Sequence, residues 1–282
     1  MPIKSHLFPQ SPPIVKWVGG KRWLIPKLRQ IVQAEFIAHP CWTDALIVDL
    51  FAGGASIPLG LGDLFKHVTV NDINPHLINL YNCVQVENLT KSPVEFGNCS
   101  EDFYRARTQF NANIDRGEIR GGEMAGLFYY LCKTAYNGLC RISKSGKYNT
   151  PFGHYKSIEY ATDFLEFAAT IEDWTISKGD FDLVTIGEPA FIYADPPYWG
   201  KDVFTGYAST PFGWDEQVRL ANWLSEQQGI MVASNYPDPA ILELYGSLGF
   251  EIEFVTARCT VAASVAARGK RQEMLAIKRN WT

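Results

Sequence analysis

The tetrapeptide Asp195-Pro196-Pro197-Tyr198 combines side chains that could hold a small planar amine. Each proline fixes φ and lacks an N–H, so the backbone is rigid here and its carbonyl groups have fewer local donors. Asp195 and the Pro196 carbonyl could accept the two N–H bonds of an exocyclic amine, which would localise its lone pair, while Tyr198 stacks on the attached ring. The alternative is a proline turn with a capping aspartate after an edge strand.

A second candidate site surrounds Gly53-Gly54, which follow Asp49-Leu50-Phe51-Ala52. The pattern does not satisfy GxGxxG, so a pyrophosphate cradle is not expected. Asp72 lies about 20 residues beyond the glycines, the spacing at which an acid reaches ribose hydroxyls. S-adenosylmethionine fits both facts, because it carries a ribose, has no phosphate, and has a sulfonium cation that tolerates carboxylates. An ordinary tight turn is the other interpretation of the two glycines.

Two further segments combine basic and aromatic residues. In Lys16-Trp17-Val18-Gly19-Gly20-Lys21, the tryptophan offers a stacking face and Lys21 could meet a carboxylate; a surface turn has the same composition. Residues 136–156 interleave Arg and Lys with aromatics, as would a hairpin loop that grips phosphates and reads bases, or a solvated loop. Arg141 could make the bidentate contact to guanine. Arg258, Arg268, Lys270 and Arg271 form another basic cluster, for phosphates or for plain surface.

The elements that must position these residues are short apolar strands. Strands are expected at 45–49, 67–72, 190–194 and 229–233, and Pro75 opens a helix-like stretch after the second. Each strand ends in acidic or polar residues. In open α/β sheets ligands bind at the carboxyl ends of the strands, so these residues are predicted to share one site. The alternating segments 251–255 and 273–277 predict a closing antiparallel hairpin.

The middle of the chain has a different pattern. Strand-like runs vanish between residues 87 and 160, where helix-like segments cover 101–110 and 124–134. We interpret residues 87–160 as an inserted, mainly helical subdomain, with 1–86 and 161–282 forming a discontinuous α/β core.

Composition narrows the class of protein. The 282 residues are 46% hydrophobic, which excludes a disordered chain. The 26 Lys+Arg and 30 Asp+Glu residues give a formal net charge of −4. This charge argues against a uniformly basic surface for nucleic acid but allows a local basic face. No run has the roughly 18 apolar residues of a membrane span, and no secretory signal opens the chain, so we expect a soluble cytoplasmic protein. The six cysteines lack zinc-ligand spacing; we expect reduced thiols and no metal.

The chain resembles the Dam-like (D12 class) family of DNA adenine-N6 methyltransferases over nearly its entire length. The resemblance is carried by five motifs in their order: KWxGGK, DxFxGG, Asp-x-Asn, NG-x-x-R with N-x-P-F-G, and DPPY. The resemblance implies a Rossmann-like, S-adenosylmethionine-dependent methyltransferase core with an inserted, mainly helical DNA-recognition subdomain. It further implies a monomer that acts on double-stranded DNA. Some such enzymes serve restriction-modification, and whether an endonuclease accompanies this one stays open.

The resemblance also assigns residues. The residues expected to bind S-adenosylmethionine include the two glycines of the turn; they are Trp17, Lys21, Phe51, Gly53, Gly54, Asp72, Asp180, Phe181 and Asp195. The expected catalytic residues, around the flipped adenine, are Asp195, Pro196, Pro197 and Tyr198. The expected DNA contacts are Lys16, Tyr136, Asn137, Leu139, Arg141, Lys144, Lys147 and Pro151. The enzymes that give the family its name read GATC, so GATC or a close relative is the expected target. Ser143, Tyr148 and Trp199-Gly200 depart from the family pattern, which bears on the outer bases more than on the chemistry.

The expected mechanism is direct in-line methyl transfer to an adenine extruded from the duplex, with Tyr136 as a candidate base-step wedge and neither a covalent intermediate nor a metal. Alternatives within the enzyme class are methylation of adenine in RNA, of cytosine N4 or of a glutamine side chain. A non-catalytic DNA-binding module with the same fold is another alternative. A nicotinamide-dependent oxidoreductase is disfavoured by the missing GxGxxG.

Overall fold

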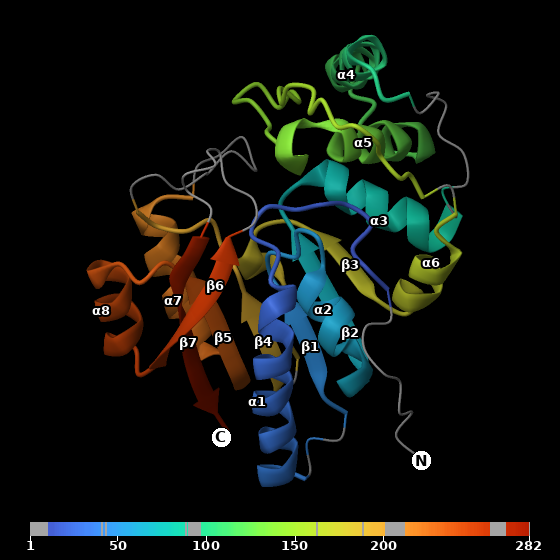
Figure 1. Ribbon diagram of the computed structural model, residues 1–282. Coiled ribbons are helices and arrows are strands. Elements are labelled where there is room, and N and C mark those ends of the chain that lie inside the picture. Colours follow the sequence, from blue (N-terminus) through green and yellow to red (C-terminus); the bar gives the residue numbers. More distant parts are fainter. Residues whose placement is uncertain are drawn as a thin grey trace.

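A seven-stranded sheet with the order β3-β2-β1-β4-β5-β7-β6 forms the centre of the protein (Figure 1). The computed structural model describes residues 11–40, 42, 44–87, 89, 97–161, 163–187, 189–200, 212–259 and 269–281. The parallel strands are β1 (Leu46–Asp49), β2 (His67–Asp72), β3 (Thr175–Lys178), β4 (Ala190–Ala194) and β5 (Gly229–Asn235). The antiparallel strands are β6 (Glu251–Cys259) and β7 (Gly269–Asn280).

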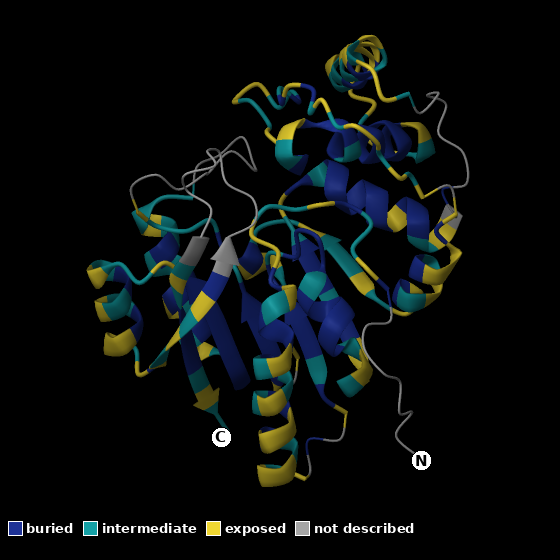
Figure 2. Ribbon diagram, in the orientation of Figure 1, coloured by how far each residue is buried: buried dark blue, intermediate teal, exposed yellow. Residues whose placement is uncertain are grey.

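The sheet is buried on both faces, which is why its central strands are continuous apolar runs. In β1, Ile47 joins the apolar cluster on one face and Val48 the cluster on the other, because successive side chains of a strand alternate. Helices α1 (Ile25–Ala38) and α2 (Ser56–Leu61) contribute to the first cluster. Helices α7 (Trp214–Glu226) and α8 (Pro239–Ser247) contribute to the second. Figure 2 shows the resulting buried centre between exposed outer helix faces.

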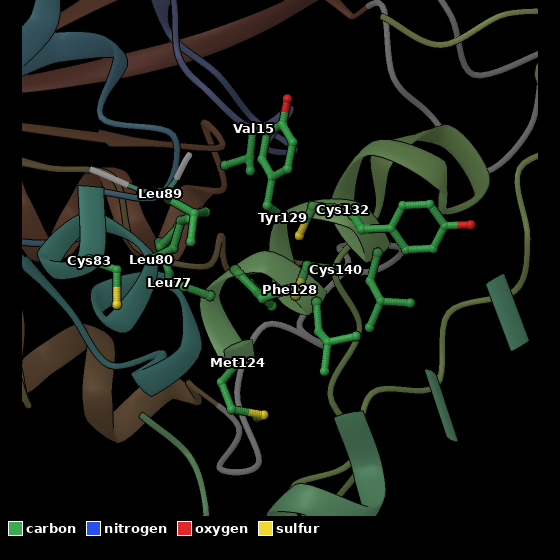
Figure 3. Packing of buried hydrophobic residues seen from close by; sticks show 14 of the residues in the cluster. Val15, Leu77, Leu80, Cys83, Leu89, Met124, Phe128, Tyr129, Cys132 and Cys140 are labelled. Atoms are coloured by element: carbon green, nitrogen blue, oxygen red, sulfur yellow. The ribbon is translucent and has the colours of Figure 1, made fainter. Parts of the chain in front are cut away.

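The helical layer beyond the sheet is built on α3 (Pro75–Glu87). Its helices are α4 (Ser100–Asp115), α5 (Gly122–Thr134) and α6 (Leu165–Ile171). Leu77 and Leu80 of α3 belong to the same buried cluster as Met124 and Phe128 of α5 (Figure 3), and α4 packs on α5 (Figure 1). The described residues between α3 and β3 are mainly helical, and their core is continuous with α3. Their assignment to an inserted subdomain, with boundaries at 87 and 160, stays a prediction.

Among the described residues, no helix combines the length and apolar character needed to cross a membrane. Cys83, Cys132 and Cys140 are buried, whereas Cys99 is exposed. The expected terminal hairpin is present as β6 and β7. Strand β3 was not predicted, because Thr-Ile-Ser-Lys is short and only its middle residues are half-buried.

The direction in which the chain winds changes between two neighbouring strands. From β1 it proceeds to β2 and β3 on one side, and β4 then lies on the other side of β1. Such a switch point, at the carboxyl ends of the strands, is where open α/β sheets bind ligands. Asp49 ends β1, and Asp195 follows β4 directly. Topology alone therefore places these two carboxylates at the expected ligand site.

Candidate active site

The glycine turn is built around Asp72, at the end of β2. One oxygen of its carboxylate, Oδ2, accepts the Gly53 N–H at 2.9 Å, and Oδ1 accepts the Asn74 N–H at 2.8 Å. The Tyr81 hydroxyl donates to the Gly53 carbonyl at 2.5 Å. Asp72 thus fixes the turn, and its pKa is raised by burial although these backbone donors favour the charged form.

Trp17 lies directly against this turn. Gly53 has φ +47°, and a Cβ added there would lie 2.6 Å from Trp17 Cδ1. The left-handed backbone and the approach of the indole both require glycine. The structure therefore joins two segments that the sequence had suggested separately, the tryptophan motif and the glycine turn.

We expect Gly53→Ala to weaken binding of S-adenosylmethionine by at least about tenfold, because the new methyl group displaces Trp17 and strains the turn. Isothermal titration with S-adenosylmethionine measures the loss. The matched control is Gly117→Ala, which also has positive φ but open space around its Cβ position. Equal affinities for wild type and Gly53→Ala would show that the turn does not shape the donor site.

Lys21 is the centre of a buried polar cluster. Its ammonium group lies 2.7 Å from Asp195 Oδ2, donates to the Gly19 carbonyl at 2.8 Å and is 3.8 Å from Glu273 Oε2. It also lies 5.0 Å from the centre of the Tyr198 ring, and the Tyr198 hydroxyl donates to Glu273 Oε2 at 2.9 Å. The side chain of Lys21 is only 5% exposed, so these interactions are little screened by solvent.

Burial sets the protonation behaviour of the cluster. It raises the pKa of Asp195, while the adjacent Lys21 favours the carboxylate. Asp195 Oδ1 is buried and accepts no hydrogen bond from the described residues, so it has free lone pairs for a ligand. Burial, together with the charges of Asp195 and Glu273, holds the pKa of Tyr198 well above its usual value, so its phenol stays protonated and donates.

A buried amide network holds the backbone after Asp195. Gln217 Nε2 of α7 donates to the Pro197 carbonyl at 2.8 Å, and Asn235 Nδ2 at the end of β5 donates to Gln217 Oε1 at 2.9 Å. Asn235 Oδ1 in turn accepts the Trp199 N–H at 3.2 Å. Both amide side chains are fully buried. The Pro-Pro turn is therefore fixed on both sides by protein donors and acceptors, beyond the stiffness of its own rings.

Asp49 carries the most crowded carboxylate of the switch point. It is buried, accepts the Phe51 N–H at 3.3 Å, and its pKa is raised well above the usual value by burial and by the charges of Asp195 and Asp72. A ligand that brings positive charge to this edge would relieve that repulsion. The sequence pattern had placed Asp49 beside the glycines without giving it a role.

We expect Asp49→Asn to stabilise the ligand-free protein at neutral pH. The native carboxyl keeps its proton to a higher pH than the unfolded one, so the free energy of unfolding falls as pH rises from about 3.8 through the raised native pKa. Asparagine removes that dependence and can still accept from Phe51. The melting temperature of the variant minus that of wild type should therefore grow as the pH rises above about 3.8, until the native carboxyl has lost its proton. A difference that does not change with pH would contradict this expectation.

The predicted aromatic residues of the donor site lie together on the other side of the turn. The rings of Phe51 and Phe181 have centroids 5.9 Å apart. Asp180 accepts the Phe181 N–H at 2.7 Å and pairs with Arg219 at 2.6 Å, and the Arg219 guanidinium lies 4.2 Å from the Phe181 ring centre. Asp180 thus caps the short helix that presents Phe181. Sequence reasoning had not found Arg219.

The basic and aromatic loop forms a hairpin, as predicted. Ile142 and Tyr148 form an antiparallel bridge, and the Ser143 N–H donates to the Lys147 carbonyl at 2.8 Å. The hydroxyl of the buried Tyr148 donates to the backbone carbonyl of Leu139 at 3.1 Å and to that of Leu131 at 3.3 Å. Tyr148 therefore supports the hairpin from inside and is not a candidate base contact.

The exposed face of the hairpin carries the predicted DNA contacts. Arg141 is exposed, and its Nε donates to Asn149 Oδ1 at 2.6 Å. Lys144 is exposed, and Tyr136 is 42% exposed. Lys147 differs from these residues, because it pairs with Asp115 at 2.8 Å.

The remaining predicted contacts surround the base of the hairpin. The Pro151 carbonyl accepts the Tyr136 N–H at 2.9 Å, which closes the loop. Lys16 packs on Gly138, and its ammonium lies 5.4 Å from the Tyr155 ring centre. Asn137, with φ 54°, and Leu139 are half-buried. In the second basic cluster, Arg271 stacks on Tyr236, and the side chains of Arg258, Arg268 and Lys270 lie outside the described residues.

The mainly parallel sheet, with antiparallel β7 between β5 and β6 and an acidic site at the switch point, defines a Rossmann-like α/β protein that binds its ligand at the carboxyl ends of the strands. Residues 17–261 match the family of D12 class N6 adenine-specific DNA methyltransferases, and the chain belongs to this family. It is therefore an adenine-specific DNA methyltransferase, as the motifs had indicated.

Relatives of this kind align over nearly their whole length. The chain is 31% identical to a DNA adenine methylase of Vibrio cholerae serotype O1, over 93% of this chain and 94% of the relative. It is 30% identical to a DNA adenine methylase of Haemophilus influenzae, over 98% of this chain and 97% of the relative. It is 28% identical to the retron Ec67 DNA adenine methylase of Escherichia coli, over 94% and 90%.

Proposed function

We propose that this enzyme extrudes an adenine from duplex DNA and methylates its N6 while Asp195, the Pro196 carbonyl and Tyr198 hold the base, at GATC or a closely related site. The observation that carries the proposal is the buried, unpartnered Oδ1 of Asp195, beside a tyrosine ring and at the switch point of the sheet. An exocyclic amine has N–H groups that could donate the hydrogen bond that this oxygen does not receive from the described residues.

The residues at the switch point fit S-adenosylmethionine. This group, when bound, supplies an electrophilic methyl on a sulfonium cation. A cation bound at this edge would interact favourably with the carboxylates of Asp72 and Asp195, and would favour ionisation of Asp49, whose pKa burial and the neighbouring acids raise. The Gly53 turn holds Trp17 at this edge, and the Phe51 and Phe181 rings offer an apolar wall. We assign these residues, with Trp17, Lys21, Gly54 and Asp180, to the donor site.

The amine is activated by acceptors that are already in place. Lys21 occupies Asp195 Oδ2 and leaves Oδ1 for one N–H of the adenine, while the Pro196 carbonyl accepts the other. With its two N–H groups held by Asp195 and the Pro196 carbonyl, N6 would direct its lone pair out of the ring plane, toward the methyl group that a bound S-adenosylmethionine would supply. The electron pair of the sulfur–carbon bond would leave with the neutral thioether, and the surplus proton of the cationic N6 would then pass to solvent. Asp195 acts as an acceptor in this scheme and need not be a strong base.

Extrusion of the base is favoured by the exposed aromatic residue on the hairpin. Unstacking costs a few kcal/mol, and stacking on Tyr198 returns about 1–3 kcal/mol. Tyr136, which is exposed at the base of the hairpin, would enter the base step that the adenine leaves. Transfer in line to N6 requires this rotation, because a stacked and paired base hides its amine.

DNA recognition is assigned to the hairpin and to Lys16. Arg141 would read guanine in the major groove, Lys16 would contact a base, and Lys144 would contact a phosphate. Asn137, Leu139 and Pro151 shape the loop for this task. Lys147 reaches a phosphate only by leaving Asp115. The names of the relatives, DNA adenine methylases, support a DNA target. The resemblance of the hairpin motifs to a family that reads GATC supports GATC or a related site.

Expression in a bacterial host that lacks adenine methylation tests this function. Mapping of N6-methyladenine across the host genome should show modification of nearly every GATC, or of one related site, and none in cells that express Asp195→Ala. Methylation of RNA alone, or absence of methyl transfer to any nucleic acid, would refute the proposal. The first result would favour the RNA alternative, and the second the non-catalytic module.

A further inference from the structure

We infer that Glu273 is a positioning residue for the methyl transfer, which sets the orientation of the Tyr198 ring and shares the charge of Lys21. The inference rests on the proposed function, in which Asp195 and Tyr198 hold the adenine. The chain alone did not reveal this role, because Glu273 appears in it only as one residue of an alternating strand.

The position of Glu273 follows from strand direction. Because β7 runs antiparallel to β5, Met274 lies opposite Asn235, the last residue of β5. Glu273 is one residue further, at the edge where the parallel strands end and where Asp195 follows β4. Its side chain is only 12% exposed. The last strand of the sheet thus returns a carboxylate to the site built by the first strands.

The contact with Tyr198 determines how the ring lies. The hydroxyl donates to Glu273 Oε2 at 2.9 Å, and a hydrogen bond to a carboxylate is stronger than one between neutral groups. A fixed hydroxyl limits rotation of the side chain. A stacking platform held in this way loses less conformational entropy when a base arrives. Glu273 is therefore placed to prepare Tyr198 for the adenine before binding.

The second effect of Glu273 is electrostatic. Lys21 lies 2.7 Å from Asp195 and 3.8 Å from Glu273, so one ammonium group serves two carboxylates. The charge of Glu273 raises the pKa of Asp195, and Lys21 opposes this effect by favouring the Asp195 carboxylate, so the lysine is shared between the two acids. Loss of the Glu273 charge would leave Lys21 to neutralise Asp195 alone.

A double-mutant cycle separates these effects from simple loss of structure. We expect Glu273→Ala and Tyr198→Phe each to reduce the single-turnover rate by about tenfold with little change in affinity for DNA. The double variant should lose about tenfold to thirtyfold in rate, much less than the product of the two single losses, because both changes remove the same hydrogen bond. Glu273→Gln, whose amide oxygen can still accept from Tyr198, should recover part of the rate of Glu273→Ala.

The control is Glu253→Gln in the neighbouring strand β6, where Glu253 pairs with Lys27 at the surface and is 37% exposed. Its rate should equal that of wild type. Unchanged rates for both Glu273 variants, or losses that multiply in the double variant, would overturn the inference. If Glu273→Ala fails to fold, Tyr198→Phe and Glu273→Gln still form a cycle, in which Gln should have a small effect in the Phe background. A wild-type enzyme that transfers no methyl to DNA would instead refute the proposed function.

Discussion

Asp195→Asn should slow methyl transfer to DNA by about a hundredfold to a thousandfold, with little loss of DNA affinity. The amide has one acceptor oxygen instead of two, lacks the negative charge and can present N–H groups to the amine. Lys21 keeps a carboxylate neighbour, because Glu273 lies 3.8 Å away, so the cluster does not contain an isolated buried cation. Single-turnover transfer of labelled methyl groups, measured with saturating enzyme, gives the rate, and fluorescence anisotropy gives the DNA affinity.

Asp44→Asn is a matched control for this measurement. Asp44 pairs with Lys66 at the surface, and both side chains are more than half exposed, at 65% and 53%. The same chemical change there should alter neither rate nor affinity by more than about twofold. A rate for Asp195→Asn within tenfold of wild type would show that the acceptor role of this carboxylate is wrong.

The second large effect is expected from Arg141→Ala. If Arg141 reads a guanine with two hydrogen bonds, its loss should reduce discrimination between the target and a site altered at that base by about 1–3 kcal/mol. The guanidinium is exposed and is held by Asn149, so removing it disturbs no buried group. Methylation rates on two duplexes, target and single-base variant, measure the ratio.

Lys144→Ala provides the comparison, because a phosphate contact carries no base information. It should weaken binding to both duplexes equally and lower the slope of the salt dependence by about one counterion. If Arg141→Ala also weakened both duplexes equally, Arg141 would be a phosphate contact and the reading of the hairpin would need revision.

Much of this site followed from the chain because chemistry and topology agree. Apolar runs that end in Asp49, Asp72 and Asp195 predict parallel strands, and parallel strands bring their carboxyl ends to one edge. The rigid Pro-Pro turn after β4 is a local property of proline and needs no tertiary information. These features could therefore be predicted from residue types and spacing.

The residues that sequence reasoning missed depend on contacts between distant elements. Gln217 lies on the buried side of α7, and only its distance from Pro197 shows its role. Glu273 has the alternation of an ordinary strand, and a signal becomes visible only when β7 is known to run antiparallel to β5. Arg219 likewise acquires a role only when α7 lies beside Asp180. Long-range pairs of this kind are set by the packed fold and leave no short motif.

A structure of the enzyme with a duplex that contains its target and with a non-reactive analogue of S-adenosylmethionine tests the central claim most directly. We expect the adenine to lie outside the helix, with its ring stacked on Tyr198. Its N6 should lie about 2.7–3.2 Å from Asp195 Oδ1 and from the Pro196 carbonyl oxygen, and should face the sulfonium position of the donor. An adenine that stays stacked in the duplex, or an N6 that faces away from Asp195, would contradict the claim.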